Sequence, residues 1–237
     1  MHLFSIKKRL KFFESARNVS VSQKDCFVEW IKNVKLPQRA TVLSLSVGDG
    51  VWDYFAMSSD NRIKKIIATD IVENPVKKED IALLKKYGEW DYIKVTPEGK
   101  LPFKNSFFNL LFHQDTIEHV EKPFIFISEQ YRVLKKDGIL VFGTPNLFRL
   151  TNIVKLFFGR LNFPTAIGRN IELGTFVHVQ EFYEQQIKVL LKEAGFRNIE
   201  VRHCFFGVNT LKIMFSKYPR SNLGKGLCHY LMFKCVK

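Results

Sequence analysis

Cysteine is scarce in this 237-residue chain, and long hydrophobic runs are absent. The cysteines Cys26, Cys204, Cys228 and Cys235 lie far apart and form no Cys-x-x-Cys pair. This spacing argues against a zinc site and a disulfide framework, so we expect reduced thiols in a cytoplasmic protein. No apolar run approaches the roughly 20 residues that a membrane-spanning helix needs. The start, MHLFSIKKRLKFF, is not expected to be a signal peptide, because it lacks a long apolar core.

Acidic residues are missing from two segments of the chain. Residues 147–170 carry four Lys or Arg and residues 201–237 carry seven, without one Asp or Glu. Residues 1–36 add eight basic and three acidic residues. The net charge of +14 is therefore concentrated in these three segments. Such segmental charge favours an anionic partner beside them, although an ordinary lysine-rich surface is the alternative interpretation.

The hydrophobic pattern predicts one α/β domain over residues 1–237. Apolar residues make up 46% of the chain, enough for a sizeable core. Short apolar runs rich in β-branched residues alternate with amphipathic segments, which predicts a mostly parallel sheet with helices on both faces. A helical arm is expected over residues 1–38. The expected strands are 40–47, 64–71, 90–95, 107–113, 138–146, 198–207 and 227–236. The expected helices after the arm are 51–57, 77–88, 123–136 and 181–196.

Candidate ligand-binding residues follow the ends of the first two expected strands. In such sheets, ligands bind at the carboxyl ends of the strands. The run TVLSLSVGDGVW ends in Gly48-Asp49-Gly50, and glycine accepts a positive φ and leaves room for a ligand. Asp70 lies 22 residues after Gly48. This spacing is close to the offset of about 20 residues at which dinucleotide folds place the acid that binds ribose. Only two glycines are present, however, so a GxGxxG hydride-transfer enzyme is disfavoured.

The richest motif series occupies residues 101–146. It contains Leu-Pro-Phe, Glu-His-Val, Arg-Val-Leu-Lys and Thr-Pro-Asn in order. With this series, residues 40–200 resemble the class I S-adenosylmethionine-dependent methyltransferases, in the branch of ubiquinone and polysaccharide methyltransferases. The resemblance implies a Rossmann-like methyltransferase fold with a seven-stranded sheet, S-adenosyl-L-methionine as cofactor, and a cap insertion over residues 147–178.

The resemblance also implies roles for individual residues. The turn after the first strand would approach the methionine part of the cofactor, and Asp70 would accept hydrogen bonds from the ribose hydroxyls. Ile71 and the loop at 96–99 would contact the adenine, and residues 113–115, beginning with His113, would line the sulfonium side. The predicted cofactor-binding residues are Ser46, Gly48, Asp49, Gly50, Asp70, Ile71, Pro97, Glu98, Gln114 and Asp115.

Two positions depart from the family pattern. Ser44 replaces the Asp or Glu that holds the methionine ammonium, and Ser46 replaces the first glycine. A charged contact of this kind contributes about 1.5–3 kcal/mol, which Asp49 or Asp115 could supply instead. We therefore expect a modified turn that still binds the cofactor. A catalytically degenerate interaction protein on the same fold is the alternative.

Two histidines are candidates for the general base that an acceptor hydroxyl requires. His119 belongs to the Glu-His-Val motif, and His178 precedes the last large helix. Imidazole suits this role because its pKa lies near neutrality. A hydrogen-bonded structural histidine is the alternative for each. No metal site is expected, because the sequence shows no carboxylate cluster that demands one.

The basic and aromatic cap indicates the class of acceptor. Arg149 and Arg160 are predicted to bind the substrate, a small, glycan-linked or lipid-linked molecule that carries negative charge. A cap of this composition also suits peripheral contact with a membrane. Nucleic acid is the less favoured acceptor, because the sequence contains neither an RNA-binding module nor a base-flipping tetrapeptide.

Overall fold

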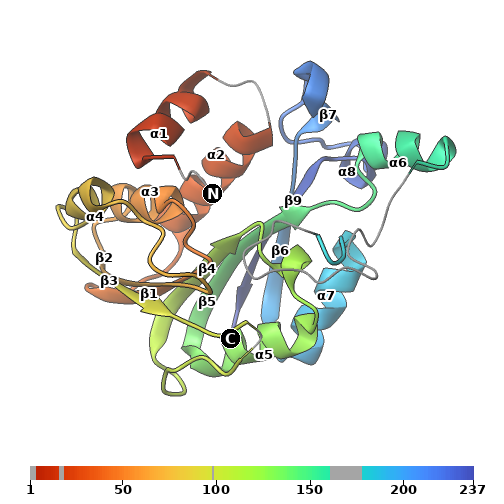
Figure 1. Ribbon diagram of the computed structural model, residues 1–237. Coiled ribbons are helices and arrows are strands. Elements are labelled where there is room, and N and C mark those ends of the chain that lie inside the picture. The colour runs from red at the N-terminus through yellow and green to blue at the C-terminus, as the bar shows by residue number, and fades with distance from the viewer. Residues whose placement is uncertain (1–3, 16–18, 98, 161–177) are drawn as a thin grey trace.

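The computed structural model describes residues 4–15, 19–97, 99–160 and 178–237 (Figure 1). A seven-stranded sheet forms the centre, with the order β3-β2-β1-β4-β5-β9-β6. Only β9 runs antiparallel to its neighbours β5 and β6. The predicted mostly parallel, seven-stranded sheet is thus confirmed. The strands are β1 (Ala40–Leu45), β2 (Ile63–Asp70), β3 (Glu89–Lys94), β4 (Phe108–Gln114), β5 (Leu134–Pro145), β6 (Arg197–Cys204) and β9 (Tyr230–Val236).

Helices cover both faces of the sheet, and the alternation of side chains along β4 shows how. Leu110 and Phe112 pack in one hydrophobic cluster with α2 and α3, and Leu111 packs in a second cluster with α5 and α7. Successive strand residues point to opposite faces, so a continuous apolar run supplies both layers. The main helices are α1 (Ile6–Ser15), α2 (Val19–Asn33), α3 (Val51–Ser59), α4 (Lys78–Leu84), α5 (Pro123–Val133), α6 (Leu150–Phe157) and α7 (Glu184–Glu193).

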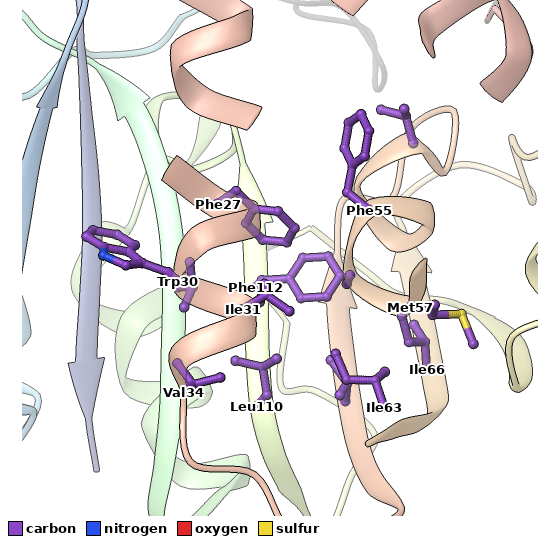
Figure 2. Packing of buried hydrophobic residues seen from close by; sticks show 14 of the residues in the cluster. Phe27, Trp30, Ile31, Val34, Phe55, Met57, Ile63, Ile66, Leu110 and Phe112 are labelled. Atoms are coloured by element: carbon purple, nitrogen blue, oxygen red, sulfur yellow. The ribbon is translucent and has the colours of Figure 1, made fainter. Parts of the chain in front are cut away.

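The predicted helical arm is part of the domain core. Figure 2 shows Phe27 of α2 facing Phe112 of β4, and their ring centroids are 5.2 Å apart. In α1, the backbone N–H of Ile6 donates to Asp80 of α4 at 3.1 Å. Phe13 of α1 is buried, whereas the neighbouring Phe12 is 41% exposed. Successive residues of a helix point about 100° apart, and only Phe13 reaches the core.

Two boundaries differ from the sequence-based expectation. Helix α5 begins at Pro123 as expected but ends at Val133, and Leu134 already pairs with Phe108 of β4. Strand pairing therefore overrides the helical pattern of the following lysines. After β6, a short hairpin of β7 (Phe206–Val208) and β8 (Ile213–Ser216) was not expected.

The remaining elements are short. They are the 3-10 turns η1 (Ile117–His119) and η2 (Asn209–Leu211), and the helix α8 (Asn222–Gly226). Among the described residues, no helix is both long enough and apolar enough to cross a bilayer.

Candidate functional site

The turn after β1 and the end of β2 meet at the carboxyl edge of the sheet, as the sequence predicted. The backbone N–H of Gly48 donates to Oδ2 of Asp70 at 3.2 Å. Gly48 and Gly50 have φ values of 55° and 81°, which favour glycine. A Cβ at Gly48 would meet no atom within 4 Å, so a ligand has room to approach this backbone. The turn and Asp70 therefore fit the methionine and ribose parts of the expected cofactor.

Ser44 points away from this edge and bonds to an acid on the next helix. Its hydroxyl donates to Oδ1 of Asp53 in α3 at 2.6 Å, and the Trp90 indole N–H donates to Oδ2 at 2.7 Å. Asp53 is fully buried, and this burial raises its pKa to about 7. Ser44 thus serves as an internal anchor, and the carboxylate absent from β1 stands on α3.

The other residues predicted for the turn and the adenine lie at the ends of β1, β2 and β3. Ser46 is exposed with a φ of 53°, a left-handed conformation unusual for serine. Ile71 is partly buried directly after Asp70. Exposed Pro97 belongs to the loop after β3, which begins with a hydrogen bond from Val95 N to Asp70 O at 2.9 Å. Glu98, also predicted here, lies outside the described residues.

Two carboxylates lie in the field of Arg9, an arginine that no sequence motif marked. Oδ2 of Asp49 lies 3.0 Å from Nε of Arg9 in α1. Desolvation raises the pKa of Asp49, and Arg9 opposes this. Asp115 is exposed at the surface, yet desolvation by the protein around it raises its pKa to about 6, although Tyr230, His178 and Arg9 favour its ionised form. Both proposed substitutes for an acid at position 44 therefore lie near one guanidinium.

The two residues before Asp115 face in different directions. The Tyr230 hydroxyl donates to buried Gln114 at 3.3 Å. His113 points to the opposite face, where its ring stacks on Phe142 with centroids 4.8 Å apart. Burial lowers the pKa of His113 to about 3, so this imidazole is neutral. The expectation that His113 lines the sulfonium side is therefore wrong, because the alternation of β4 places it in the core.

The two histidines predicted to be catalytic lie together. The rings of His119 and His178 meet edge to face with centroids 5.0 Å apart. Nδ1 of His178 lies 2.8 Å from Oε1 of Glu181. We call His119, His178 and the adjacent Glu118 the histidine group; one ligand atom from each lies within 4.8 Å of the others. Two imidazoles and a carboxylate can move a proton and can also hold a divalent cation, which the sequence did not predict.

Glu118 is the buried acid of the histidine group. Thr144 Oγ1 donates to its Oε2 at 2.9 Å, and the side chain is fully buried. Burial, with Asp115 nearby, raises the pKa of Glu118 well above its ordinary value, which favours the protonated form. The Glu-His pair is visible in the sequence, but the burial of Glu118 is not visible in a tripeptide.

Arg149 does not project from a cap toward an acceptor. Its guanidinium pairs with the buried carboxylate of Glu181, including a contact from Nη2 to Oε1 at 2.9 Å. Burial opposes ionisation of Glu181, yet hydrogen bonds from His178 and Arg149 hold its pKa below the usual range. Arg149 thus fixes Glu181, which in turn bonds His178. Arg160 is exposed beyond the end of α6 and does not join this ion pair; cap residues 161–177 lie outside the described residues.

Residues 44–142 match the family model described as a methyltransferase domain. This part of the chain is therefore a methyltransferase domain, and S-adenosyl-L-methionine is the cofactor that it implies. The match spans β1 to β5 and so includes the turn, Asp70, Asp115 and His119. No curated protein matches the sequence of the chain.

Solved structures of the same fold cover nearly the whole chain. A SAM-dependent methyltransferase from Thermotoga maritima is 20% identical over 98% of this chain and 96% of its own, with a TM-score of 0.60. A SAM-dependent methyltransferase from Archaeoglobus fulgidus is 15% identical over 96% of this chain and 97% of its own, also with a TM-score of 0.60. The [4+2]-cyclase SpnF, 16% identical over 90% and 80%, scores 0.60 as well. These likenesses establish the Rossmann-like methyltransferase fold, and the cyclase shows that this fold alone does not fix the reaction.

Proposed function

We propose that the chain transfers a methyl group from S-adenosyl-L-methionine to a hydroxyl of an anionic acceptor, carried on a glycan or a lipid. The observation that carries this proposal is the contact between His178 and Glu181 beside the end of β4. An ionised Glu181 accepts from Nδ1–H of His178, which leaves Nε2 as the basic nitrogen of that tautomer. Such an imidazole can take the proton of a hydroxyl acceptor.

The cofactor, when bound, supplies an electrophilic methyl group on a sulfonium, and the chain's residues align and orient the reaction. Asp70 would accept from the ribose hydroxyls, and the Gly48–Gly50 backbone would receive the methionine part. Asp49 and Asp115 would supply the negative charge that Ser44 lacks. The basic residues of segments 147–160 and 201–237 would attract an anionic acceptor.

Cofactor binding is tested first, by titration calorimetry with S-adenosyl-L-methionine. We expect micromolar affinity for the parent chain and about a tenfold to hundredfold loss in Asp70→Asn, which keeps the shape but removes the charged acceptor. Asp91→Asn, on the exposed neighbouring strand β3, is the matched control and is expected to bind normally. No binding at millimolar cofactor would favour the interaction protein.

The acceptor class is tested by methyl transfer to sugars, phosphorylated sugars and lipid-linked intermediates. We expect turnover with an anionic, carrier-linked acceptor, and His178→Gln to lower kcat by about a hundredfold while cofactor affinity holds. Nucleic acid methylation is the competing activity, supported only by the basic charge. A gel-shift titration in salt separates the two, because phosphate contacts weaken steeply as salt rises.

A further inference from the structure

One end of the molecule carries the most exposed apolar side chains of the described chain. Among residues 4–15, 19–97, 99–160 and 178–237, six large apolar side chains are more than half exposed, and Phe157 reaches 86%. Isolated exposed apolar residues are ordinary, but a group of them marks an interaction surface. These six, which we call the apolar patch, are Leu156, Phe157, Phe158, Leu211, Phe215 and Leu223.

All six come from elements that lie side by side. Helix α6 contacts β7, and β7 pairs with β8 across the connection that contains η2. The backbone N–H of Leu150 donates to Leu227 O at 3.1 Å, which ties the start of α6 to the end of α8. Figure 1 shows α6, α8 and β7 grouped at one end of the molecule. The apolar patch is therefore one surface assembled from segments far apart in sequence.

Exposed cations accompany the apolar patch. Five exposed lysines and arginines lie on the elements of the apolar patch or beside them, and within the part of the chain that the structure describes none of the five forms an ion pair with an acidic side chain. Residues 201–237 contain no acid. The surface thus combines protruding apolar groups with uncompensated positive charge. The cations are Lys155, Arg160, Lys212, Arg220 and Lys225, all exposed.

We propose that the apolar patch and its five cations dock the protein on the surface of an anionic lipid bilayer. Phe157 and its neighbours would enter the boundary between headgroups and acyl chains, and the cations would contact lipid phosphates. A second copy of this chain is the poorer occupant. A symmetric dimer would bring the same cations against one another, and like charges across an interface oppose association.

The apolar patch is continuous with the proposed site. Helix α6 begins at Leu150, directly after the Arg149 that pairs with Glu181. A bilayer docked on α6 would therefore lie beside the elements that hold His178. This last step rests on the proposed function, in which the acceptor is carried on a lipid; docking itself does not.

Vesicle flotation tests the inference on the full chain without cofactor or acceptor. We expect binding to vesicles of phosphatidylcholine with phosphatidylglycerol, little binding to phosphatidylcholine alone, and release by high salt. Phe157→Ser with Leu223→Ser should weaken binding about tenfold or more. The control, Phe124→Ser with Val189→Ser, removes apolar groups that are each 48% exposed on α5 and α7, outside the apolar patch, and should bind as the parent does.

Three results would overturn the inference. The first is absence of binding to the anionic vesicles. The second is binding by the Phe157 and Leu223 variant that equals that of the parent, with unchanged circular dichroism. The third is a dimer of the parent chain, seen by light scattering, that the two substitutions dissociate. The last result would assign the apolar patch to a second copy of the chain. The proposed function fails separately, since a chain that floats with vesicles but binds no S-adenosyl-L-methionine would refute only the enzyme.

Discussion

The hydroxyl of Ser44 donates to the buried carboxylate of Asp53 at 2.6 Å. The resemblance implies an acid at position 44, where this chain has a serine, and the carboxylate of α3 bonds both this serine and Trp90. The pair joins β1, α3 and β3 below the cofactor turn. The departure from the family pattern is therefore a local rearrangement of a buried polar network.

Restoring the acid at position 44 is expected to harm the protein. Ser44→Asp would place a second carboxylate against Asp53 in a buried setting, where two like charges cannot both ionise at low cost. We expect the free energy of unfolding in urea to fall by about 2–4 kcal/mol at neutral pH. The double variant Ser44→Asp with Asp53→Ser should recover much of this loss. A stable single variant with tighter cofactor binding would contradict the assignment.

The left-handed conformation of Ser46 predicts a stabilising substitution. A non-glycine residue at a φ of 53° costs about 1 kcal/mol, which Ser46→Gly would remove. We expect a higher melting temperature, measured by calorimetry. The same change in the exposed Ser58 of α3 is the control, and it should destabilise by about 0.5 kcal/mol because glycine weakens a helix. A change of melting temperature in the same direction for both variants would contradict the strain at Ser46.

Cofactor affinity is expected to depend on pH through Asp115. Its pKa of about 6 means that the carboxylate is ionised above that pH and protonated below it. A sulfonium prefers the ionised form, so affinity should fall by up to about tenfold between pH 7 and pH 5. Calorimetry in matched ionic strength measures this slope. The Asp115→Asn variant should bind the cofactor more weakly at pH 7, and its affinity should no longer change with pH. The same pH dependence in this variant would show that another group titrates.

Removing the charge of Glu181 tests how His178 is held. Glu181→Gln leaves the Arg149 guanidinium without its buried partner and withdraws the acceptor from His178 Nδ1. We expect unfolding free energy to fall by about 3 kcal/mol and kcat by about tenfold to hundredfold, with the KM for cofactor unchanged.

The control for Glu181 is Glu184→Gln on α7. Glu184 also pairs with a histidine and a lysine, His203 and Lys188, but on the sheet side of α7. The Glu184→Gln variant should have a lower free energy of unfolding, but its folded form should keep the kcat of the parent. Equal kinetic losses in both variants would show that Glu181 acts only through folding.

The ion pair between Arg9 and Asp49 is expected to hold α1 over the cofactor turn. A partly buried pair of this kind contributes about 1 kcal/mol, so Arg9→Gln should raise the opening of α1 about fivefold. Hydrogen exchange of residues 6–15 measures it, and α2 should not respond. Exposed Lys11→Gln is the control on the same helix. Unchanged exchange in Arg9→Gln would show that the contacts of Ile6 and Phe13 anchor α1 without the ion pair.

The sequence predicted those features whose cause is local. Gly48, Gly50 and Asp70 follow strand ends, and the Pro at 123 opens a helix, so chain position alone located them. The motif spacing gave the fold class for the same reason. His119 was found as a motif member and His178 by its place before the last large helix, and the fold brings their rings together.

Features that depend on pairing across the fold were not accessible from the sequence. Arg9 meets Asp49 only because α1 packs on α3, and no pattern near either residue signals this. Arg149 was predicted to bind the substrate, and its pairing with Glu181 was not foreseen because Glu181 lies beyond the cap in sequence. His113 and Gln114 are neighbours at the end of β4, where a functional site was expected. Only the alternation of side chains along β4 places them on opposite faces of the sheet.

The order of strands in the sheet differs from the order in which a ribosome makes them. Strand β9 lies between β5 and β6, although β6 is synthesised before it. Until β9 emerges, the β5 edge lacks a neighbour and β6 has no place to pair, so both expose unsatisfied backbone groups. Nascent chains of this protein are therefore most prone to aggregation just before β9 is added, and chaperones should matter most at that stage.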